Sequence, residues 1–222
     1  LHRLARLPAR PHRSSPLCFS PPPSTVRGAM DSMKIKLVLI GPAKVGKSRI
    51  ANYLAEFEEN PNFETYNPTV GVRILEFERD VKSKGGRVTK IQVEVWDASG
   101  DKKYENCWPS ITKNASGVIM VYDPNIRTQE RDIELWHKAF VQPLKLSDSQ
   151  VLICAHQRDP VGKRNYLPSQ KLERYPFAVS GLDNAEGLAA LRKSFDQFLV
   201  GVVKAVAEKS KADMEEGMRS LA

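Results

Sequence analysis

The residues with the clearest chemical implication lie between Gly41 and Ser48, where the sequence reads Gly-Pro-Ala-Lys-Val-Gly-Lys-Ser. The glycines allow the backbone to wrap closely around an anion, so that successive N–H groups point at phosphate oxygens. Lys47 would place a positive charge beside the terminal phosphates, and the Ser48 hydroxyl would be a magnesium ligand. The pattern predicts a phosphate-binding loop whose nucleotide contacts are Gly41, Ala43, Lys44, Val45, Gly46, Lys47 and Ser48.

The elements on either side of this loop are those that a phosphate-binding loop needs. An apolar run at 35–40 precedes it and predicts a strand over 34–40. After the loop, apolar residues recur at helical spacing and predict an amphipathic helix over 47–57. A chance glycine-rich turn would not be expected to stand between a strand and a helix in this order. The chain is therefore predicted to bind a nucleoside phosphate.

The rest of the chain alternates between predicted strands and helices. Further strands are expected at 72–77, 91–96, 117–122, 151–155 and 175–179, and further helices at 128–141 and 188–206. A Gly-Gly turn within 82–87 predicts a hairpin between the second and third strands. This order predicts an α/β fold with a six-stranded, mostly parallel sheet and helices on both faces. The short interval between 159 and 175 leaves room only for a shortened fourth helix, or for none.

The net charge of the 222-residue chain is +8, and it is unevenly distributed. Residues 1–29 contain five arginines, six prolines and no acidic residue. We interpret 1–29 as a disordered, basic extension rich in proline and serine, with an organelle-targeting peptide as the alternative. Residues 30–210 are then expected to form the folded domain and 211–222 a C-terminal tail. The remaining body carries little net charge, so nucleic acid is not expected as a partner.

Two further motifs follow the loop, and they carry a family resemblance. The first is Pro68-Thr69-Val70-Gly71, continuing to Glu78; the second is Trp96-Asp97-Ala98-Ser99-Gly100, continuing to Pro109. In this order the motifs resemble the Ras-like small GTPases of the Rab-like branch, above all the Rab-like GTPase subunits of intraflagellar transport complex B. The resemblance covers about residues 34–206. It implies a P-loop NTPase fold of the small-GTPase type that binds GTP or GDP with Mg²⁺.

The resemblance also implies roles for individual residues. Thr69 would join Ser48 on the magnesium ion when a γ-phosphate is present, and Asp97 would bind the ion through water. Gly100 would offer its backbone N–H to the γ-phosphate. Contacts that only a triphosphate can make would order two loops, which are released after hydrolysis. The implied metal ligands are Ser48, Thr69 and Asp97, and the implied catalytic positions are Thr69, Gly100 and Asp101.

Asp101 is also the first departure from the family pattern, which usually has glutamine at this position to orient the attacking water. An anion there should position water poorly beside a triphosphate, so slow intrinsic hydrolysis is expected. Ala43 and Lys44 stand where glycines are frequent, and they would crowd the same space. Whether the chain cycles between two nucleotide states or only holds a nucleotide stays open.

The base-reading motif is a second departure. The Asn-Lys-any-Asp of the family appears here as His156-Gln157-Arg158-Asp159, and Ser180-Gly181 matches the loop that supports the base. Asp159 would pair with guanine, and the methylenes of Gln157 would replace the usual lysine stem. A preference for guanine over adenine therefore rests on the resemblance alone. The expected nucleotide contacts in this region are His156, Gln157, Asp159, Ser180 and Gly181.

Partners and location are implied in the same way. The resemblance points to coiled-coil core subunits of intraflagellar transport complex B, in the cytoplasm and at the cilium or flagellum and its base. No cysteine follows Cys154, so the C-terminal prenylation that anchors Rab proteins to membranes is not expected. The scattered cysteines fit a reducing, intracellular compartment. Trp108 is either an exposed anchor for a partner or a core residue.

Three alternatives stay open at this stage. A Rab-like regulator outside cilia would have the same fold. A pseudo-GTPase scaffold would hold nucleotide without cycling, because Asp101 affects the hydrolysis rate and not the exchange rate. A P-loop phosphotransferase would belong to a different class and should have an arginine-rich lid. Arg158 and Arg164 do not make a convincing lid.

Overall fold

The computed structural model describes residues 33–56, 66–83, 85–157, 170–181 and 185–219. The strands are β1 (Met33–Ile40), β2 (Val72–Lys82), β3 (Val88–Ala98), β4 (Gly117–Tyr122), β5 (Val151–Gln157) and β6 (Phe177–Gly181). The α-helices are α1 (Lys47–Leu54), α2 (Trp108–Thr112), α3 (Arg127–Trp136) and α4 (Ala185–Arg219). Shorter turns include a 3₁₀ helix, η1, at Lys102–Cys107 and a π-helical turn at His137–Val141.

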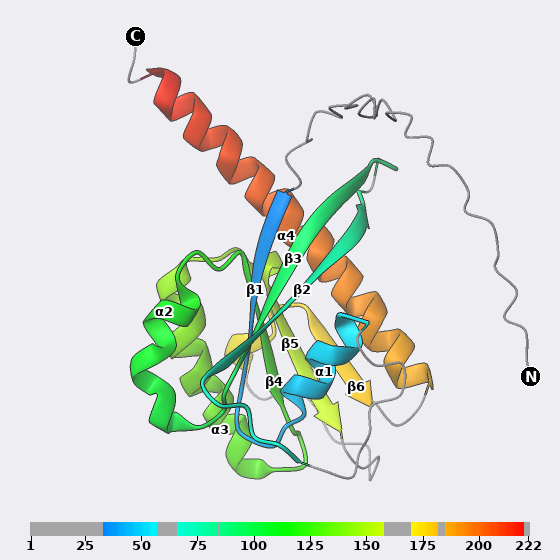
Figure 1. Ribbon diagram of the computed structural model, residues 1–222, viewed down its shortest axis with the longest axis vertical. Helices are drawn as coiled ribbons and strands as arrows, with labels where there is room; N and C mark the ends of the chain where they lie inside the picture. Colours follow the sequence, from blue (N-terminus) through cyan, green and yellow to red (C-terminus); the bar gives the residue numbers. More distant parts are fainter. Residues whose placement is uncertain (1–32, 57–65, 84, 158–169, 182–184, 220–222) are drawn as a thin grey trace, which may run out of the picture. The chain divides into compact units, whose positions relative to one another are not determined.

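The strands form a six-stranded sheet in the order β2-β3-β1-β4-β5-β6. β2 is antiparallel to β3, and the other neighbouring strands run parallel. Helices α1 and α4 pack on one face and α2 and α3 on the other, and Figure 1 shows the strands with these helices around them. The predicted α/β fold with a six-stranded, mostly parallel sheet is confirmed.

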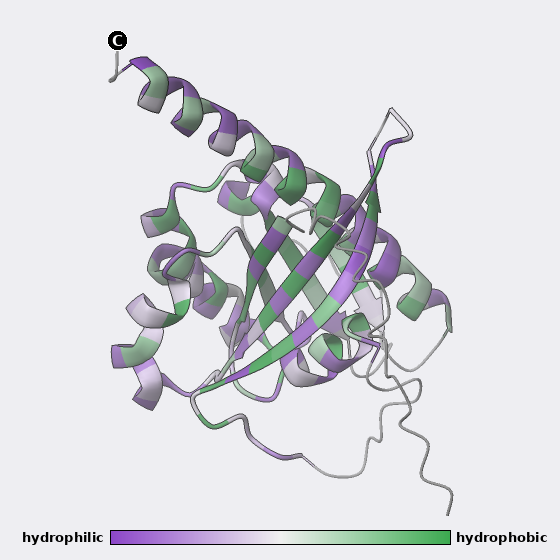
Figure 2. Ribbon diagram, turned by 45° about the horizontal axis from the view of Figure 1, so that its top comes forward, coloured by the Kyte–Doolittle hydropathy of each residue, from purple (hydrophilic) through white to green (hydrophobic). Residues whose placement is uncertain are grey.

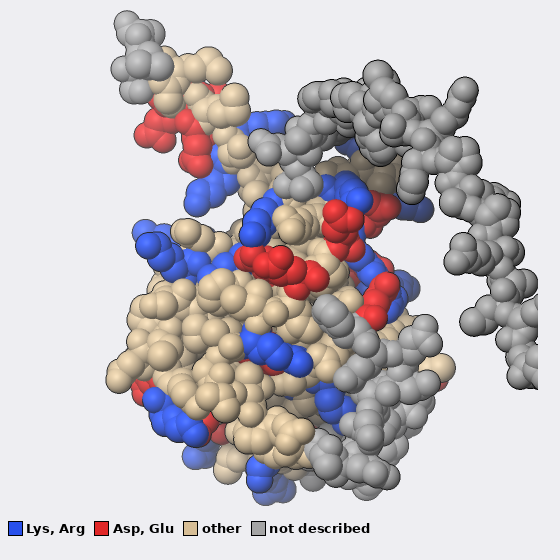
Figure 3. Space-filling model, in the orientation of Figure 1, with Lys and Arg blue, Asp and Glu red and all other residues tan. Residues whose placement is uncertain are grey.

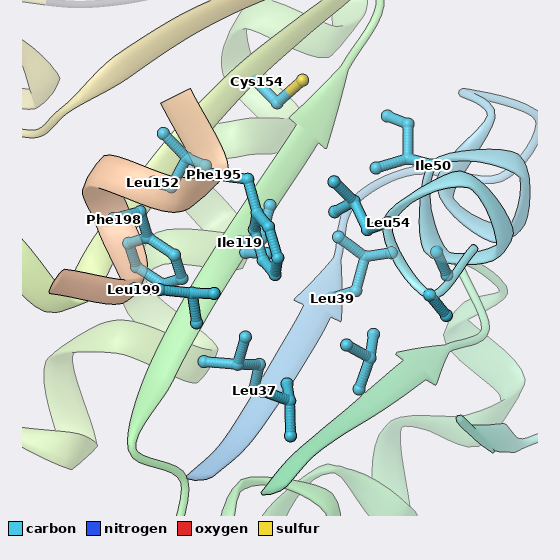
Figure 4. Close-up of a cluster of buried hydrophobic side chains, with 14 of the residues drawn as sticks. Leu37, Leu39, Ile50, Leu54, Ile119, Leu152, Cys154, Phe195, Phe198 and Leu199 are labelled. Atoms are coloured by element: carbon cyan, nitrogen blue, oxygen red, sulfur yellow. The ribbon is translucent and has the colours of Figure 1, made fainter. Parts of the chain in front are cut away.

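Strand β1 is continuously apolar from Leu37 to Ile40, and its position in the sheet explains this run. Ile35, Leu37 and Leu39 pack into a cluster with α1 and α4, part of which is drawn in Figure 4. Val38 and Ile40 point to the opposite face and pack with residues of α2 and α3. Successive side chains of a strand alternate between faces, so a central strand covered on both sides is apolar at nearly every position.

The parallel strands also bring the functional segments together. The carboxyl ends of β1, β3, β5 and β6 share one edge of the sheet, because these strands run in the same direction. The phosphate-binding loop follows β1, Asp97 lies near the end of β3, and the base-reading residues follow β5 and β6. Ligand-binding residues of open α/β sheets are commonly found at this edge.

Two helices differ in extent from the sequence prediction. α1 ends at Leu54, because the chain turns into the left-handed conformation at Glu56, with φ of 58°. The predicted end, residue 57, lies outside the described residues. α4 continues to Arg219, well past Val202, its last buried apolar residue, so the segment 211–219 expected as a tail is helical. Within the described ranges, no helix combines the length and apolar character needed to cross a membrane.

The sequence predicted a shortened fourth helix, or none, between residues 159 and 175, ahead of β6 and separate from α4. Most of this interval is outside the described residues. The structure describes it again from residue 170, where a 3₁₀ turn spans Gln170–Leu172. The predicted hairpin between β2 and β3 is confirmed, and Gly86 in its turn has φ of 78°. A positive φ of this size explains the glycine, since other residues rarely adopt it.

Candidate nucleotide-binding site

The loop from Gly41 to Ser48 connects β1 to α1 as predicted. Gly41 has φ of 140°, and a side chain there would collide with the carbonyl oxygen of Val121 on β4. Gly46, the N-cap of α1, has φ of 86°, and a Cβ at this position would lie 2.6 Å from Cδ2 of His156. Both glycines are therefore required by backbone conformation and by close neighbours. The N-terminus of α1, with its free N–H groups, follows directly.

Lys47 is the buried cation of this loop. Its side chain is only 6% exposed, and Nζ donates to the carbonyl oxygens of Gly41 at 2.9 Å and Pro42 at 2.7 Å. Burial lowers the pKa of Lys47 to about 8, and the nearby carboxylate of Asp97 opposes this shift. The position favours an anionic ligand such as a phosphate.

The three predicted metal ligands are brought together by the fold. The hydroxyl oxygens of Ser48 and Thr69 lie 2.8 Å apart, although 21 positions separate them. Asp97 is fully buried, and neither of its carboxylate oxygens has a hydrogen-bond partner among the described residues. Burial raises the pKa of Asp97, while Ser48, Arg73 and Lys47 pull it back down.

This donor set fits a hard divalent cation. Mg²⁺ prefers oxygen ligands and is usually held by one or two carboxylates together with substrate phosphates. The buried carboxylate of Asp97 accepts no hydrogen bond from the described residues, and its ion pair with Arg73 spans 3.4 Å, so a further cation beside it would be stabilised. In the part of the chain that the structure describes, no group of three or more His, Cys, Asp or Glu side chains is placed to hold a metal ion by itself. A metal site at this edge would thus depend on the ligand's phosphates to complete its coordination.

Arg73 is a residue of this site that the sequence reasoning did not single out. Its Nη2 donates to the backbone oxygen of Ser48 at 3.1 Å and to Oδ1 of Asn52 at 2.7 Å. The same nitrogen lies 3.4 Å from Oδ2 of Asp97. Arg73 thereby ties the start of β2 to the first turns of α1 and to the end of β3. A charged residue on an edge strand is ordinarily solvated, so its sequence context gave no signal of this role.

The two predicted switch segments also touch each other and the loop. The N–H of Ser99 donates to the carbonyl oxygen of Gly71 at 2.8 Å. A Cβ at Gly100 would collide with the backbone of Pro42 and would lie 2.7 Å from Cα of Ala43. The absence of a side chain at Gly100 is what allows the second switch to lie directly on the phosphate-binding loop.

Asp101 is exposed, and its carboxylate is already engaged. Oδ1 accepts from the N–H of Lys103 at 3.0 Å, and Oδ2 lies 2.9 Å from the Lys103 ammonium. These two interactions, the backbone hydrogen bond first, lower the pKa of Asp101. Asp101 is therefore the N-cap of η1. Its effect on hydrolysis stays a prediction.

On the base side, His156 is buried instead of facing the edge of the sheet. Its ring is 1% exposed and lies against Gly46, while Nδ1 is 3.0 Å from the hydroxyl of Ser180. Ser180 also lies 3.3 Å from the sulfur of Cys154. His156 and Ser180, predicted as nucleotide contacts, thus join β5, β6 and the phosphate-binding loop. Asp159 lies outside the described residues.

Gln157 and Gly181 are the last residues of β5 and β6, and they pair with each other in the sheet. This register brings the two predicted base-contacting segments side by side. Gly181 is half-buried.

A family model and curated relatives both match this chain over most of its folded part. The model described as "Ras of Complex, Roc, domain of DAPkinase" matches residues 36–159. The zebrafish (Danio rerio) intraflagellar transport protein 22 homolog is 35% identical over 182 residues, which cover 81% of this chain and 96% of that protein. The human homolog is 33% identical over 186 residues, covering 83% and 97%. This chain belongs to the intraflagellar transport protein 22 family.

Solved structures of the intraflagellar transport protein 22 family agree with the fold. A crystal structure titled "T. brucei IFT22/74/81 GTP-bound" matches with a TM-score of 0.60 and 25% identity, covering 79% of this chain and 98% of that chain. A second, titled "T. brucei IFT22 GTP-bound", matches with a TM-score of 0.55 and 25% identity, covering 76% and 95%. The small-GTPase fold and the family predicted from the sequence motifs are confirmed.

The sequence left two roles for Trp108, an exposed anchor for a partner or a core residue, and the structure decides between them. Its ring centroid lies 4.9 Å from those of Trp136 and Phe140, and the ring packs against the cluster that covers one face of the sheet. The side chain is half-buried, whereas Cys107 and Pro109 on either side of it are exposed. Trp108 is therefore a packing residue that fixes α2 on α3, and an exposed-anchor role does not fit.

Proposed function

We propose that this protein is a GTP-binding subunit of intraflagellar transport complex B that supports the assembly of cilia or flagella. The observation that carries the proposal is the assembled phosphate side of the site: the buried Lys47, the Ser48–Thr69 hydroxyl pair and the buried carboxylate of Asp97. Family membership supplies the context, since the related T. brucei IFT22 structures are titled GTP-bound. Membership of this family also argues against the alternative that the protein is a P-loop phosphotransferase.

In this proposal each residue of the phosphate side has one task. Lys47 neutralises the β- and γ-phosphates, which raises its pKa back above about 8 when the anion is bound. Ser48 and Thr69 would hold Mg²⁺ by their hydroxyls, and Asp97 would hold it through water. The ion would offset charge on the phosphates. Guanine would be read by Asp159 with support from β6, which is the part of the proposal that rests on family membership alone.

The partners proposed are coiled-coil core subunits of complex B, at the cilium or flagellum and its base. The relative in one solved structure is crystallised as IFT22/74/81, which supports an assembly of this kind. The first switch would report the nucleotide state to such a partner through Thr69. Slow intrinsic hydrolysis, from Asp101 in place of glutamine, would give long-lived triphosphate complexes.

A nucleotide-holding scaffold is the second candidate, and Arg73 is the observation that favours it. Its hydrogen bonds to Ser48 and Asn52 hold the start of β2 against α1 by contacts within the chain itself. A first switch fixed in this way would change little between GTP and GDP. Binding to partners would then be independent of the nucleotide.

One set of experiments separates these candidates. The nucleotide that co-purifies with the full chain identifies the base, and its exchange rate is measured by adding a fluorescent GTP or ATP analogue. Pull-downs with complex B core subunits then compare the GDP form, the form bound to a non-hydrolysable GTP analogue, and Thr69→Ala. A switch predicts stronger binding with the GTP analogue and loss of that difference in Thr69→Ala. Equal binding in all three supports the scaffold, and no nucleotide affinity at all would refute both.

A further inference from the structure

Arg73 and Asp97 face each other across the antiparallel pair of β2 and β3. Residues directly opposite in such a pair lie on the same side of the sheet, where opposite charges attract each other. Nη2 of Arg73 lies 3.4 Å from Oδ2 of Asp97, whose side chain is fully buried. In the described part of the chain, Arg73 is the only cation that forms an ion pair with Asp97. The metal side of the site therefore includes a positive charge that the protein itself supplies.

This pair differs from the other ion pairs of β2. Figure 2 shows that β2 carries hydrophilic residues between hydrophobic ones, and Figure 3 shows acidic and basic side chains next to one another around the upper end of β2 and β3. Arg79, for example, pairs with Glu56 and Asp196, whose carboxylates are exposed. Exposed ion pairs contribute little, because water and salt screen them. Arg73 is 42% exposed, but the carboxylate of Asp97 has lost its water, so a cation beside it has a larger effect.

The guanidinium group of Arg73 is held in place by α1. Its Nη2 donates to Oδ1 of Asn52 at 2.7 Å and to the backbone oxygen of Ser48 at 3.1 Å. These contacts are made within the chain, so the charge does not depend on a ligand for its position beside Asp97. The two hydrogen bonds and the ion pair all come from one nitrogen atom. A single ammonium group is therefore able to replace it.

A cation in this place changes how much a divalent ion adds to the site. Without the ion, an uncompensated Asp97 would repel the phosphates of the ligand, and Arg73 offsets this repulsion. With the ion, two cations share one carboxylate and repel each other, which weakens the binding of Mg²⁺. Both effects reduce the free energy that Mg²⁺ contributes to nucleotide binding.

We propose that Arg73 is a built-in counterion of Asp97 that lowers the dependence of nucleotide binding on Mg²⁺. The inference rests on the proposed function, since it concerns the same phosphate side. Arg73 is a positioning residue in this role, because it acts on the ligand through the carboxylate of Asp97. Coupling between two ligands is reciprocal, so the nucleotide complex also binds Mg²⁺ less tightly than it would without Arg73. The protein therefore keeps its nucleotide when Mg²⁺ is scarce.

The test is the dissociation constant of a fluorescent GTP analogue for the full chain, measured once in excess Mg²⁺ and once in EDTA. The ratio of the EDTA value to the Mg²⁺ value expresses the dependence on Mg²⁺. Arg73→Gln should raise this ratio about tenfold, which is within the usual range for coupling between two ligands. Arg73→Lys keeps the charge and should leave the ratio within about threefold of that of the natural chain. Asn52→Ala removes the anchor of Nη2 on α1 and should raise the ratio by a smaller factor than Arg73→Gln.

Arg79→Gln is the matched control, because it makes the same charge change on the same strand, where the partners of Arg79 are Glu56 and Asp196. It should leave the ratio unchanged. Circular dichroism shows whether each variant is folded. A purely structural role of Arg73 would lower the affinity by the same factor in both conditions, and the ratio would then not move.

An unchanged ratio in Arg73→Gln would overturn the inference, and if that variant does not fold, an unchanged ratio in Asn52→Ala would do so. A ratio in Arg73→Lys equal to that in Arg73→Gln would also overturn it, because charge would then not be the cause. In each of these cases the natural chain still binds the analogue, so only the role of Arg73 is refuted. A natural chain that binds the analogue in neither condition would refute the proposed function itself.

Discussion

On the phosphate side of the site, backbone groups and glycines make most of the close contacts, whereas on the base side the contacts run through side chains. Gly41, Gly46 and Gly100 each lie against another chain segment where a Cβ would not fit. His156 and Ser180 instead meet through an imidazole and a hydroxyl. Contacts that depend on the lack of a side chain tolerate almost no substitution. Side-chain contacts can be rebuilt with other residues, which explains why the base-reading motif departs from the family pattern while Gly41, Gly46 and Gly100 are kept.

The largest effect that this comparison predicts is from Lys47→Ala, because Lys47 is the one side chain of the loop buried with its charge towards the ligand position. Triphosphate affinity should fall about 100-fold or more, as expected for charge-assisted hydrogen bonds to phosphate. Titration with a fluorescent GTP analogue measures it. Lys138→Ala is the control, since Lys138 is an exposed lysine outside the site and its loss should lower the affinity by less than about threefold. Equal losses in both would contradict the assignment of Lys47.

Gly100→Ala should come next, with a loss of roughly 10- to 30-fold in triphosphate affinity. The added methyl collides with the backbone of Pro42 and Ala43, so either the second switch or the phosphate-binding loop must move. The same titration applies. Gly85→Ala in the hairpin turn meets nothing within 4 Å and should change nothing. Unchanged affinity in Gly100→Ala would mean that this close contact does not persist in solution.

His156→Ala tests the base side. It removes a buried hydrogen bond to Ser180 and leaves space beside Gly46, which should lower the free energy of unfolding by about 1–3 kcal/mol. Affinity should fall by less than about tenfold, since the ring packs against the loop backbone. Urea unfolding and nucleotide titration are compared, with His156→Asn retaining a polar group as control. A large loss of affinity at unchanged stability would place His156 in direct contact with the nucleotide.

The smallest effect is expected at Asp101. Intrinsic hydrolysis should be slower than about 10⁻⁴ s⁻¹, and Asp101→Gln should raise it by a few fold only, because Ala43 and Lys44 are expected to crowd the same space. Single-turnover phosphate release measures the rate. Asp101→Asn keeps a cap for η1 while removing the charge. A gain in Asp101→Asn equal to that in Asp101→Gln would show that charge, and not water orientation, limits the reaction.

The amino-acid sequence alone determined the phosphate-binding loop, the strand and helix order, and the family. These features are local: the spacing of Gly41, Gly46, Lys47 and Ser48, and apolar runs whose period shows which face is covered. Loop residues with special backbone angles admit few amino acids, so the sequence shows them directly. Helix ends were less predictable, because the stop of α1 at Leu54 depends on a left-handed residue, Glu56, that could equally have continued the helix.

Only the tertiary structure decided how distant residues share one site. Arg73 contacts Asn52 from 21 positions away, and His156 meets Ser180 across 24. Such partners are set by the strand order of the sheet, and the surrounding sequence of each residue carries no record of them. The same holds for Trp108, whose two possible environments differ only in whether Trp136 and Phe140 stand beside it. Burial is a property of the packed fold, so a residue that suits both core and surface is assigned only when its neighbours are known.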